Sequence, residues 1–241
     1  MTCPFHARYL LRATRNSIFI ALSVLLLCGC VDDSPTIDGY TYKTVKIGDQ
    51  EWFAESLKTT VYANGDEIPY SRTDESWTTL EEGMRCSYDH EEAMNAKYGQ
   101  LYNWYAVDDE RGLCPTKWHV PSEEDWKDLE VFLGMSRVDV SLEGDRGSGE
   151  LGIGTKLKAR GGWQKDGNGK DDIGFSALPG GYRTSFDGKF YNDGFYGYWW
   201  SSSPNGGSAW YRYLNNYGPA IVRVNSVPKV GLSVRCLRDA D

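Results

Sequence analysis

The chain has 241 residues, with 26 basic and 34 acidic side chains, and carries a formal net charge of −8. An excess of negative charge repels phosphate backbones, which argues against nucleic acid as a partner. The length is sufficient for one large domain with its own hydrophobic core.

Residues 1–29 have the pattern of an export signal, in which three arginines precede an apolar run, Ile18–Leu27. That run is about half the roughly 20 residues of a membrane-spanning helix. The sequence of Leu27–Cys30 resembles a bacterial lipobox, which implies cleavage before Cys30 and lipidation of its thiol. Several acyl chains, palmitate among them, then anchor the protein permanently in the membrane. An ordinary secretory signal with chance cysteines is the alternative.

Cleavage at residue 30 removes Arg8, Arg12 and Arg15 and no acid, which leaves 23 basic against 34 acidic residues and a charge of about −11. Asp32 and Asp33 resemble an acidic tag for the outer membrane surface, and a solvated linker explains them equally well. We therefore expect an exported lipoprotein of the bacterial cell envelope, at the outer membrane. Residues 30–38 form its tether and residues 39–241 its domain.

The first part of this domain predicts a hairpin. Tyr40–Ile47 alternates aromatic or β-branched residues with polar ones, and Gly48-Asp49 separates it from a second run, Gln50–Phe53. Residues 61–88 are polar and irregular, so we expect loops there.

A helix is predicted over Asn95–Val107, because Leu101, Trp104 and Tyr105 lie at positions i, i+3 and i+4. A clearer helix begins at Ser122, whose hydroxyl can cap the N–H of Asp125. Acidic residues fill its first turn, where the helix dipole favours them. The apolar residues at helical spacing, which predict the buried face, are Trp126, Leu129 and Leu133; Lys127 and Glu130 are expected to face water, and Gly134 to end the helix.

The last third of the sequence predicts strands. Asp187-Gly188 suits a two-residue turn between Thr184–Phe186 and Lys189–Tyr191. In the final segment, alternation predicts that the even-numbered residues 232, 234 and 236 point inward.

After lipidation three thiols remain, those of Cys86, Cys114 and Cys236, and at most one internal disulfide can form. We favour Cys114 with Cys236. A disulfide that closes a loop of about 120 residues stabilises the folded state by at most roughly 4 to 5 kcal/mol on the chain-entropy model.

Two sets of residues are candidates for binding. Flat aromatic side chains suit sugar rings or protein interfaces, although alternation leaves only about half of them outside. This surface comprises Tyr196, Tyr198, Trp199, Trp200, Trp210, Tyr211 and Tyr213, and the ligand-binding residues that we select from it are Trp199, Trp200, Trp210 and Tyr211. The second set offers oxygen ligands to calcium at alternating positions, or forms a solvated turn. It comprises Asp166, Asn168, Asp171 and Asp172. No other cofactor is indicated.

Six segments, taken in order, resemble the Fibrobacter succinogenes major paralogous domain: VKIGDQEWFAESL, YGQLYNWYAV, GLCPTKWHVPSEEDWKDLE, GFSALPGGYR, YWWSSS and GLSVRCLRD. That family more distantly resembles the C-type-lectin-like fold of formylglycine-generating enzymes. The resemblance implies an α+β domain with two helices, a small twisted antiparallel sheet and extensive loops. Those enzymes hold copper with a cysteine pair near the C-terminus, where this chain has only Cys236.

We therefore expect a surface-anchored lipoprotein with a non-catalytic binding domain for a glycan, such as a polysaccharide, or for another cell-envelope ligand. The alternative is a structural or adhesive envelope protein that makes protein contacts without binding sugar. An enzyme related to the formylglycine generators is a third hypothesis, which the missing cysteine pair disfavours.

Overall fold

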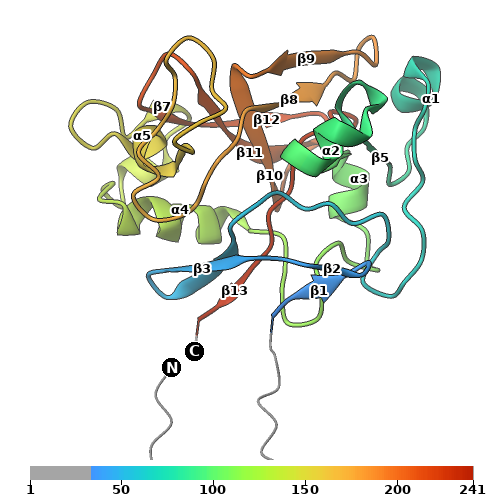
Figure 1. Ribbon diagram of the computed structural model, residues 1–241, viewed down its shortest axis with the longest axis horizontal. Helices are drawn as coiled ribbons and strands as arrows, with labels where there is room; N and C mark the ends of the chain where they lie inside the picture. Colours follow the sequence, from blue (N-terminus) through green and yellow to red (C-terminus); the bar gives the residue numbers. More distant parts are fainter. Residues whose placement is uncertain (1–33, 241) are drawn as a thin grey trace, which may run out of the picture. The chain divides into compact units, whose positions relative to one another are not determined.

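The structure is a computed structural model that describes residues 34–240. These residues form a mixed α+β domain in which short helices and long loops surround a six-stranded sheet (Figure 1). The expected α+β class is confirmed. The described residues contain five α-helices rather than two, and only α4 exceeds seven residues.

The large sheet has the strand order β7-β12-β11-β10-β8-β9. Its strands are β7 (Gly144–Arg146), β8 (Gly180–Arg183), β9 (Phe190–Asp193), β10 (Tyr196–Asn205), β11 (Ser208–Asn215) and β12 (Ile221–Ser226). Neighbours are antiparallel except β10 and β8, which run parallel where Gly197 pairs with Gly181. With six strands, this sheet is larger than the small one expected.

Two smaller sheets join segments that lie far apart in the sequence. One has the order β13-β4-β3 and contains β3 (Thr44–Ile47), β4 (Gln50–Phe53) and β13 (Leu237–Asp239). The other pairs β5 (Arg85–Cys86) with β6 (Leu101–Tyr102). The predicted first hairpin is confirmed, because Ile47 pairs with Gln50 across Gly48-Asp49.

The signal predicted at residues 1–29 and the lipidation of Cys30 lie outside the described residues. The predicted tether is described from Ser34, and there β1 (Thr36–Ile37) already pairs with β2 (Tyr40–Thr41). Ile37 is buried in the core, so folded structure starts before residue 39. In Figure 1, β1 and β13 lie at the bottom and β9 at the top.

Residues 61–88 contain more than the predicted loops. Besides β5, they form α1 (Asp74–Thr79), whose first turn is capped by the Thr73 hydroxyl, and Trp77 on α1 is fully buried. A helix this short, with one buried residue, has no apolar periodicity for a pattern to detect.

The helix predicted over residues 95–107 is wrong. Two helices, α2 (Glu92–Tyr98) and α3 (Trp104–Val107), are separated here by β6. Gly99, with φ of 81°, ends α2, and Asn103 caps α3 through its side chain. The apolar spacing was therefore shared between a strand and two helices.

The helix predicted from Ser122 is confirmed as α4 (Glu123–Phe132). The Ser122 hydroxyl accepts from the Asp125 N–H, and the Asp125 carboxylate accepts from the Ser122 N–H, which makes a capping box. Trp126 and Leu129 are buried as predicted. The remaining helix is α5 (Ile153–Leu157).

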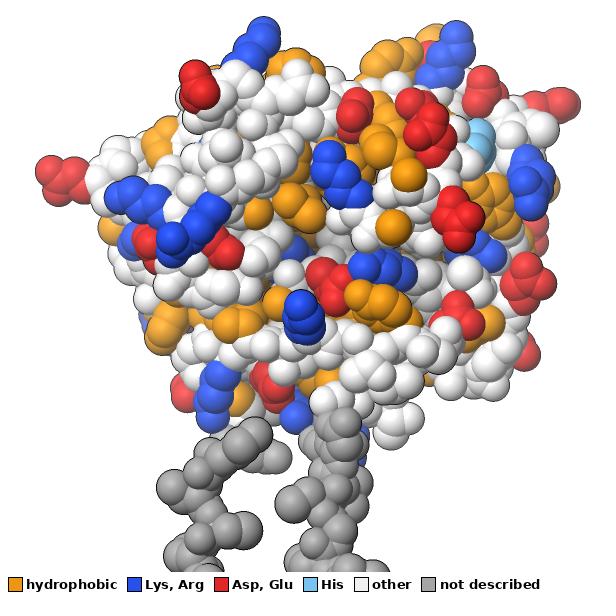
Figure 2. All heavy atoms as spheres, in the orientation of Figure 1, with side chains coloured by type: hydrophobic (Ala, Val, Ile, Leu, Met, Phe, Trp, Pro, Cys, Tyr) orange, Lys and Arg blue, Asp and Glu red, His pale blue; other side chains and the backbone are white. Residues whose placement is uncertain are grey.

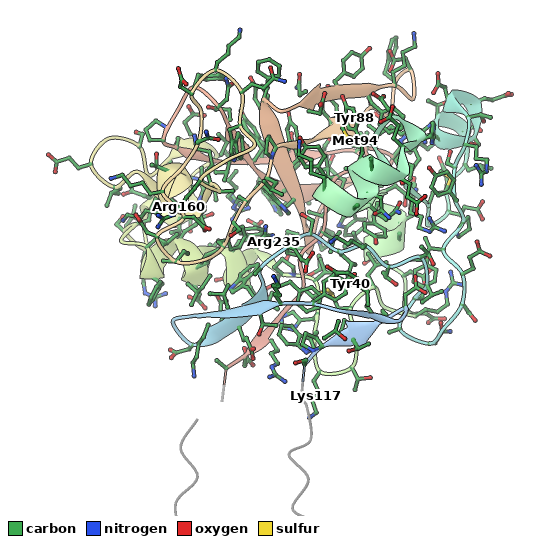
Figure 3. All side chains as sticks on the ribbon, viewed as in Figure 1. Tyr40, Tyr88, Met94, Lys117, Arg160 and Arg235 are labelled. Carbon is green, nitrogen blue, oxygen red and sulfur yellow. A yellow bond between two sulfur atoms is a disulfide. The ribbon has the colours of Figure 1, made fainter. Side chains whose placement is uncertain are left out.

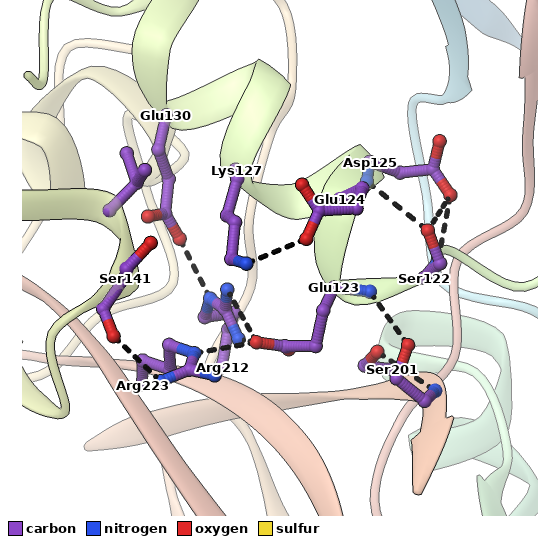
Figure 4. A network of polar contacts seen from close by, with 12 residues as sticks. Ser122, Glu123, Glu124, Asp125, Lys127, Glu130, Ser141, Ser201, Arg212 and Arg223 are labelled. Carbon is purple, nitrogen blue, oxygen red and sulfur yellow. Dashed lines mark hydrogen bonds and ion pairs between the residues drawn. The ribbon is translucent and has the colours of Figure 1, made fainter. Parts of the chain in front are cut away.

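Glu130, expected to face water, is instead fully buried. Its carboxylate accepts hydrogen bonds from Arg212 on β11 and Arg146 on β7. Glu123 likewise bonds Arg212 and Arg223, so this charged network holds α4 against the sheet (Figure 4). A glutamate has the same polar character on a solvated face and in an ion pair, so the pattern could not distinguish the two.

The predicted hairpin near Asp187-Gly188 exists, but its two-residue turn is wrong. Arg183 pairs with Phe190, so the six residues 184–189 connect β8 to β9. The Thr184 hydroxyl accepts from the Phe186 N–H and stabilises this wider loop.

The C-terminal segment is buried on both sides, not only at its even-numbered residues. The backbone of Ser233 forms hydrogen bonds with β10. The carbonyl of Cys236 accepts a hydrogen bond from the N–H of Phe53 on β4, and the carbonyl of Val234 accepts one from the chain just after β4. Arg235 is therefore buried as well. The Cys114–Cys236 disulfide is confirmed. Cys86 is a free, buried cysteine, and burial raises the pKa of its thiol to about 12.

Candidate functional site

Alternation along β10 and β11 places tyrosines on one face of the large sheet. Tyr198 pairs with Tyr213, and Trp200 with Tyr211, so these side chains point to the same side. Arg212 points to the opposite side, where it contacts Glu130 on α4. The sheet thus has one face that packs on α4 and one face rich in tyrosine.

The tyrosine rings contact one another across four strands. Tyr196 stacks on Tyr198 with ring centroids 5.7 Å apart, and Tyr182 on β8 lies 5.1 Å from Tyr198. Ring contacts continue to β9 and to the turn after β11. We call this group the tyrosine face, which consists of Tyr182, Tyr191, Tyr196, Tyr198, Tyr211, Tyr213 and Tyr217.

The tyrosine face is partly open to solvent. Tyr217 is 73% exposed and Tyr191 41%, whereas Tyr198 lies buried beneath its neighbours. Phe186, in the loop that follows β8, is 94% exposed. Hydrophobic side chains are visible at the surface along the upper edge of Figure 2, where β9 lies in Figure 1. Aromatic groups in this arrangement are typical of binding surfaces.

The phenol groups of Tyr196, Tyr211 and Tyr213 stay protonated at neutral pH. The hydrogen bond to Tyr217, with partial burial, raises the pKa of Tyr196 to about 12. Burial raises the pKa of Tyr211 to about 12, and burial together with the charge of Asp145 raises the pKa of Tyr213. Each hydroxyl can therefore both donate and accept a hydrogen bond.

Two of the four predicted aromatic ligand-binding residues are unsuitable, because the side chains of Trp199 and Trp200 are buried. Trp199 packs in the core beside α4, and its indole N–H donates to the Ser56 hydroxyl. Trp200 packs in the core on the other side of the sheet, and its N–H donates to the Tyr102 carbonyl. Neither ring can stack on a ligand.

The other two predicted residues separate onto opposite sides of β11. Tyr211 belongs to the tyrosine face, whereas half-buried Trp210 lies under the Arg223 guanidinium, 3.6 Å from its ring centroid. The candidate set had omitted Tyr182, Tyr191 and Tyr217. The alternation of side chains along β9 and β10 can be read from the sequence, but the pairing of β8 with β10 cannot.

The predicted calcium ligands do not form a cation site. The Asn168 side-chain carbonyl accepts from the Trp163 N–H, and the Asp171 carboxylate accepts from the N–H and hydroxyl of Ser176. Asp166 and Asp172 are exposed. Within residues 34–240, no group of three or more His, Cys, Asp or Glu side chains is placed to hold a metal. These oxygens stabilise turns instead.

A known protein family matches most of the chain. The family model described as the Fibrobacter succinogenes major domain matches residues 45–238. No curated protein matches the chain, and no solved structure matches it. Over the described residues, none of the helices has the length and apolar character needed to span a membrane.

Proposed function

This chain belongs to the Fibrobacter succinogenes major domain family, whose name specifies no activity, and we propose that its tyrosine face binds a polysaccharide. In this proposal the domain is non-catalytic and serves a lipoprotein anchored through Cys30 to the outer membrane. The observation that carries the proposal is the unbroken set of tyrosine ring contacts that ends in exposed Tyr191 and Tyr217.

The chemistry of the tyrosine face suits a neutral sugar chain. An aromatic ring offers an apolar surface to the C–H groups of a sugar, and the phenol oxygen offers a polar tip. The phenol groups of Tyr196 and Tyr211, whose pKa values are raised, are uncharged at neutral pH and can bond sugar hydroxyls.

The position of the two ends of the domain supports an anchored binding protein. The described chain starts beside β1, at the opposite end of the view in Figure 1 from β9. In this proposal the anchor precedes β1, so the β9 end of the tyrosine face is remote from the first described residues. We also retain the C-type-lectin-like arrangement as a proposal, supported by the pairing of β13 with β4 near the two ends of the domain.

A glycan array tests this proposal with the secreted Cys30→Ser chain, which cannot be lipidated at that residue. We expect binding to one polysaccharide class and a loss of at least about tenfold in Tyr191→Ala or Tyr217→Ala, in the range of interface hot spots. Tyr40→Ala is the control, because Tyr40 is 39% exposed on β2, outside the tyrosine face. Silence across plant and bacterial polysaccharides would overturn the proposal.

One observation favours the second candidate, an adhesive protein that contacts other envelope proteins. The Phe186 ring is almost fully exposed and carries no polar tip for a sugar hydroxyl. If Phe186→Ala abolishes attachment of whole cells to a surface while Tyr217→Ala does not, protein contact is the better description. Mass spectrometry of the N-terminal peptide tests lipidation of Cys30 independently.

A further inference from the structure

Two arginine side chains pack against one tyrosine ring beside α1 and β5. The guanidinium carbon of Arg72 lies 5.1 Å from the centroid of the Tyr70 ring, and that of Arg85 lies 5.0 Å from it. Tyr70 and Arg85 are neighbours because their backbones form a parallel bridge. On the right of Figure 2, basic side chains border a hydrophobic patch next to a histidine, over the part of the domain where α1 and β5 lie in Figure 1.

Arg85 is a buried cation that lacks a partner. It is only 8% exposed, and among residues 34–240 it has neither a carboxylate within ion-pair distance nor a hydrogen bond from its side chain. Its Nε is fully enclosed, whereas its two terminal nitrogens are not enclosed and can be reached from solvent. Buried polar groups are nearly always hydrogen-bonded, and a buried charge without compensation is costly. The terminal nitrogens of Arg85 are therefore accessible donors with no described partner.

A second buried arginine nearby shows the usual solution. The Ser71 carbonyl accepts from Arg183, and the Ser71 N–H donates to the Arg85 carbonyl, so the two arginines lie close to one another. Arg183 is fully buried, but its guanidinium donates to three backbone carbonyls and lies 3.5 Å from the Asp74 carboxylate. Its charge is thus compensated, and Asp74 is engaged with it. Arg85 differs because no described residue plays either part.

Arg72 supplies a second unpaired charge, at the surface. Its side chain is exposed, and within the described part of the chain no acid lies in ion-pair distance of it. The aromatic face of Tyr70 attracts both guanidinium groups, which holds two like charges at one ring. Like charges at this separation repel one another. An anion bound beside Arg72 and Arg85 would relieve that repulsion.

His90 borders the two arginines and is a sensor for charge bound there. Its Nδ1 lies 3.2 Å from the Tyr70 hydroxyl, and its ring packs edge to face against Phe190 on β9, with centroids 5.1 Å apart. Burial lowers the pKa of His90, and the charges of Arg183 and Arg72 act in the same direction, against those of two nearby aspartates. A bound anion would oppose the effect of the arginines.

We propose that Arg72 and Arg85 together bind an oxyanion, the carboxylate, sulfate or phosphate group of an acidic ligand. The terminal nitrogens of Arg85 donate to it from the protein side, and the exposed guanidinium of Arg72 contributes the second charge. A guanidinium matches two oxygens of such groups through parallel hydrogen bonds, and charge-assisted bonds of this kind are the stronger ones in proteins. A chain with a formal net charge of −8 repels anions in general, so a site for them requires local donors. The proposal does not depend on polysaccharide binding by the tyrosine face.

The test titrates the secreted Cys30→Ser chain separately with sodium glucuronate, sulfate and phosphate, at constant ionic strength set with sodium chloride. Calorimetry reports binding, and NMR reports whether the imidazole resonances of His90 move. We expect saturation with a dissociation constant of about 1 mM or lower for at least one anion, together with movement of the His90 resonances. No heat at about 20 mM of each anion, twenty times this constant, would overturn the proposal. Binding that leaves the His90 resonances unmoved would also overturn it, because the anion would then lie elsewhere.

Substitutions of the two arginines locate the site. Arg85→Lys keeps the charge but loses the planar fork, and should weaken binding at least about tenfold, in the range of hydrogen bonds to charged groups. Arg72→Gln changes an exposed side chain and should weaken binding about two- to fivefold, the effect of one partly screened charge. If Arg85→Lys fails to fold, the Arg72→Gln variant decides, and an unchanged affinity in that variant would refute the proposal.

Matched controls distinguish this site from general effects of charge. Arg160 is also exposed and without an acid partner among the described residues, and it lies on the left of Figure 3, away from the side of the domain where α1 lies in Figure 1. Arg160→Gln should leave anion binding unchanged, and equal losses in Arg160→Gln and Arg72→Gln would show only non-specific attraction. Glucose, which lacks the carboxylate of glucuronate, should not move the His90 resonances. Tyr217→Ala should retain anion binding, because Tyr217 belongs to the tyrosine face.

Discussion

Arg212 and Glu130 form an ion pair in which neither side chain is exposed, with Nε 2.7 Å from Oε1. The pair joins the middle of the large sheet to α4. Three guanidinium groups, those of Arg146, Arg212 and Arg223, share the carboxylates of Glu123 and Glu130. The network therefore has one positive charge more than it has negative charges, and loss of a carboxylate leaves buried cations uncompensated.

Glu130→Gln should destabilise the domain by about 3 to 5 kcal/mol, the usual cost of removing one partner from a buried ion pair. The neutral amide keeps the volume of the side chain but leaves Arg146 and Arg212 without their shared charge. Urea unfolding followed by tryptophan fluorescence measures this change.

Glu124→Gln is the control on the same helix. Glu124 pairs with Lys127, but its side chain is 78% exposed, so its charge is largely screened by water. We expect a change within about 0.5 kcal/mol. Equal losses in the Glu124 and Glu130 variants would show that the buried network does not stabilise the fold as described.

Trp126→Ala should cost about 3 to 5 kcal/mol, because it removes a buried ring and leaves a cavity. Trp126 contacts Trp52 and Phe175 in the core beneath α4. Phe132→Ala, at the last residue of the same helix, should cost less than about 1 kcal/mol, since Phe132 is 55% exposed. A loss below 1 kcal/mol for Trp126→Ala in denaturant unfolding would contradict this account.

The features predicted correctly from sequence are those whose signals are local. The Gly48-Asp49 hairpin and the capping box at Ser122 depend on residues within a few positions of one another. The burial of Glu130 depends on arginines 16 and 82 residues away, and no local pattern reports such partners. The prediction of one helix over residues 95–107 was wrong because the apolar residues at helical spacing belong to three short elements, α2, β6 and α3.

The candidate site was only partly predictable for the same reason. Alternation identified an aromatic strand pair, and Tyr211 was named from it. Trp199 and Trp200 were named too, although adjacent residues on a central strand point into opposite cores. Tyr182 and Tyr191 join the tyrosine face through pairing of β8 with β10 and β9, which is a property of the fold rather than of the sequence near them.

Replacing both Cys114 and Cys236 by alanine should lower stability by at most about 4 to 5 kcal/mol, because the bridge spans 122 residues and restricts the unfolded chain. Guanidinium unfolding measures the loss. Cys86→Ala, which keeps the bridge and removes only a small buried side chain, should cost less. The denatured, unreduced Cys30→Ser chain should show one reactive thiol after removal of residues 1–29. Three reactive thiols would mean that the disulfide does not form.

The two histidines of the described domain, His90 and His119, should have pKa values on opposite sides of the usual value for histidine. The hydrogen bond to Asp125, with Nε2 3.3 Å from Oδ2, raises the pKa of His119. Burial, followed by the charge of Arg183, lowers the pKa of His90. NMR titration of both imidazole rings in one sample therefore provides its own control, and Asp125→Asn should lower the midpoint of His119 without moving that of His90.

The sign of the effect on stability follows from the direction of the His119 shift. A folded pKa above the unfolded value of about 6.5 means that the folded state binds the proton more tightly. The contribution of His119 to the free energy of unfolding is therefore complete below about pH 6.5 and disappears as the pH rises through the folded pKa of His119. The stability advantage of the wild type over His119→Gln should thus shrink across that range. An advantage that grows with pH would show that Asp125 does not hold a protonated His119.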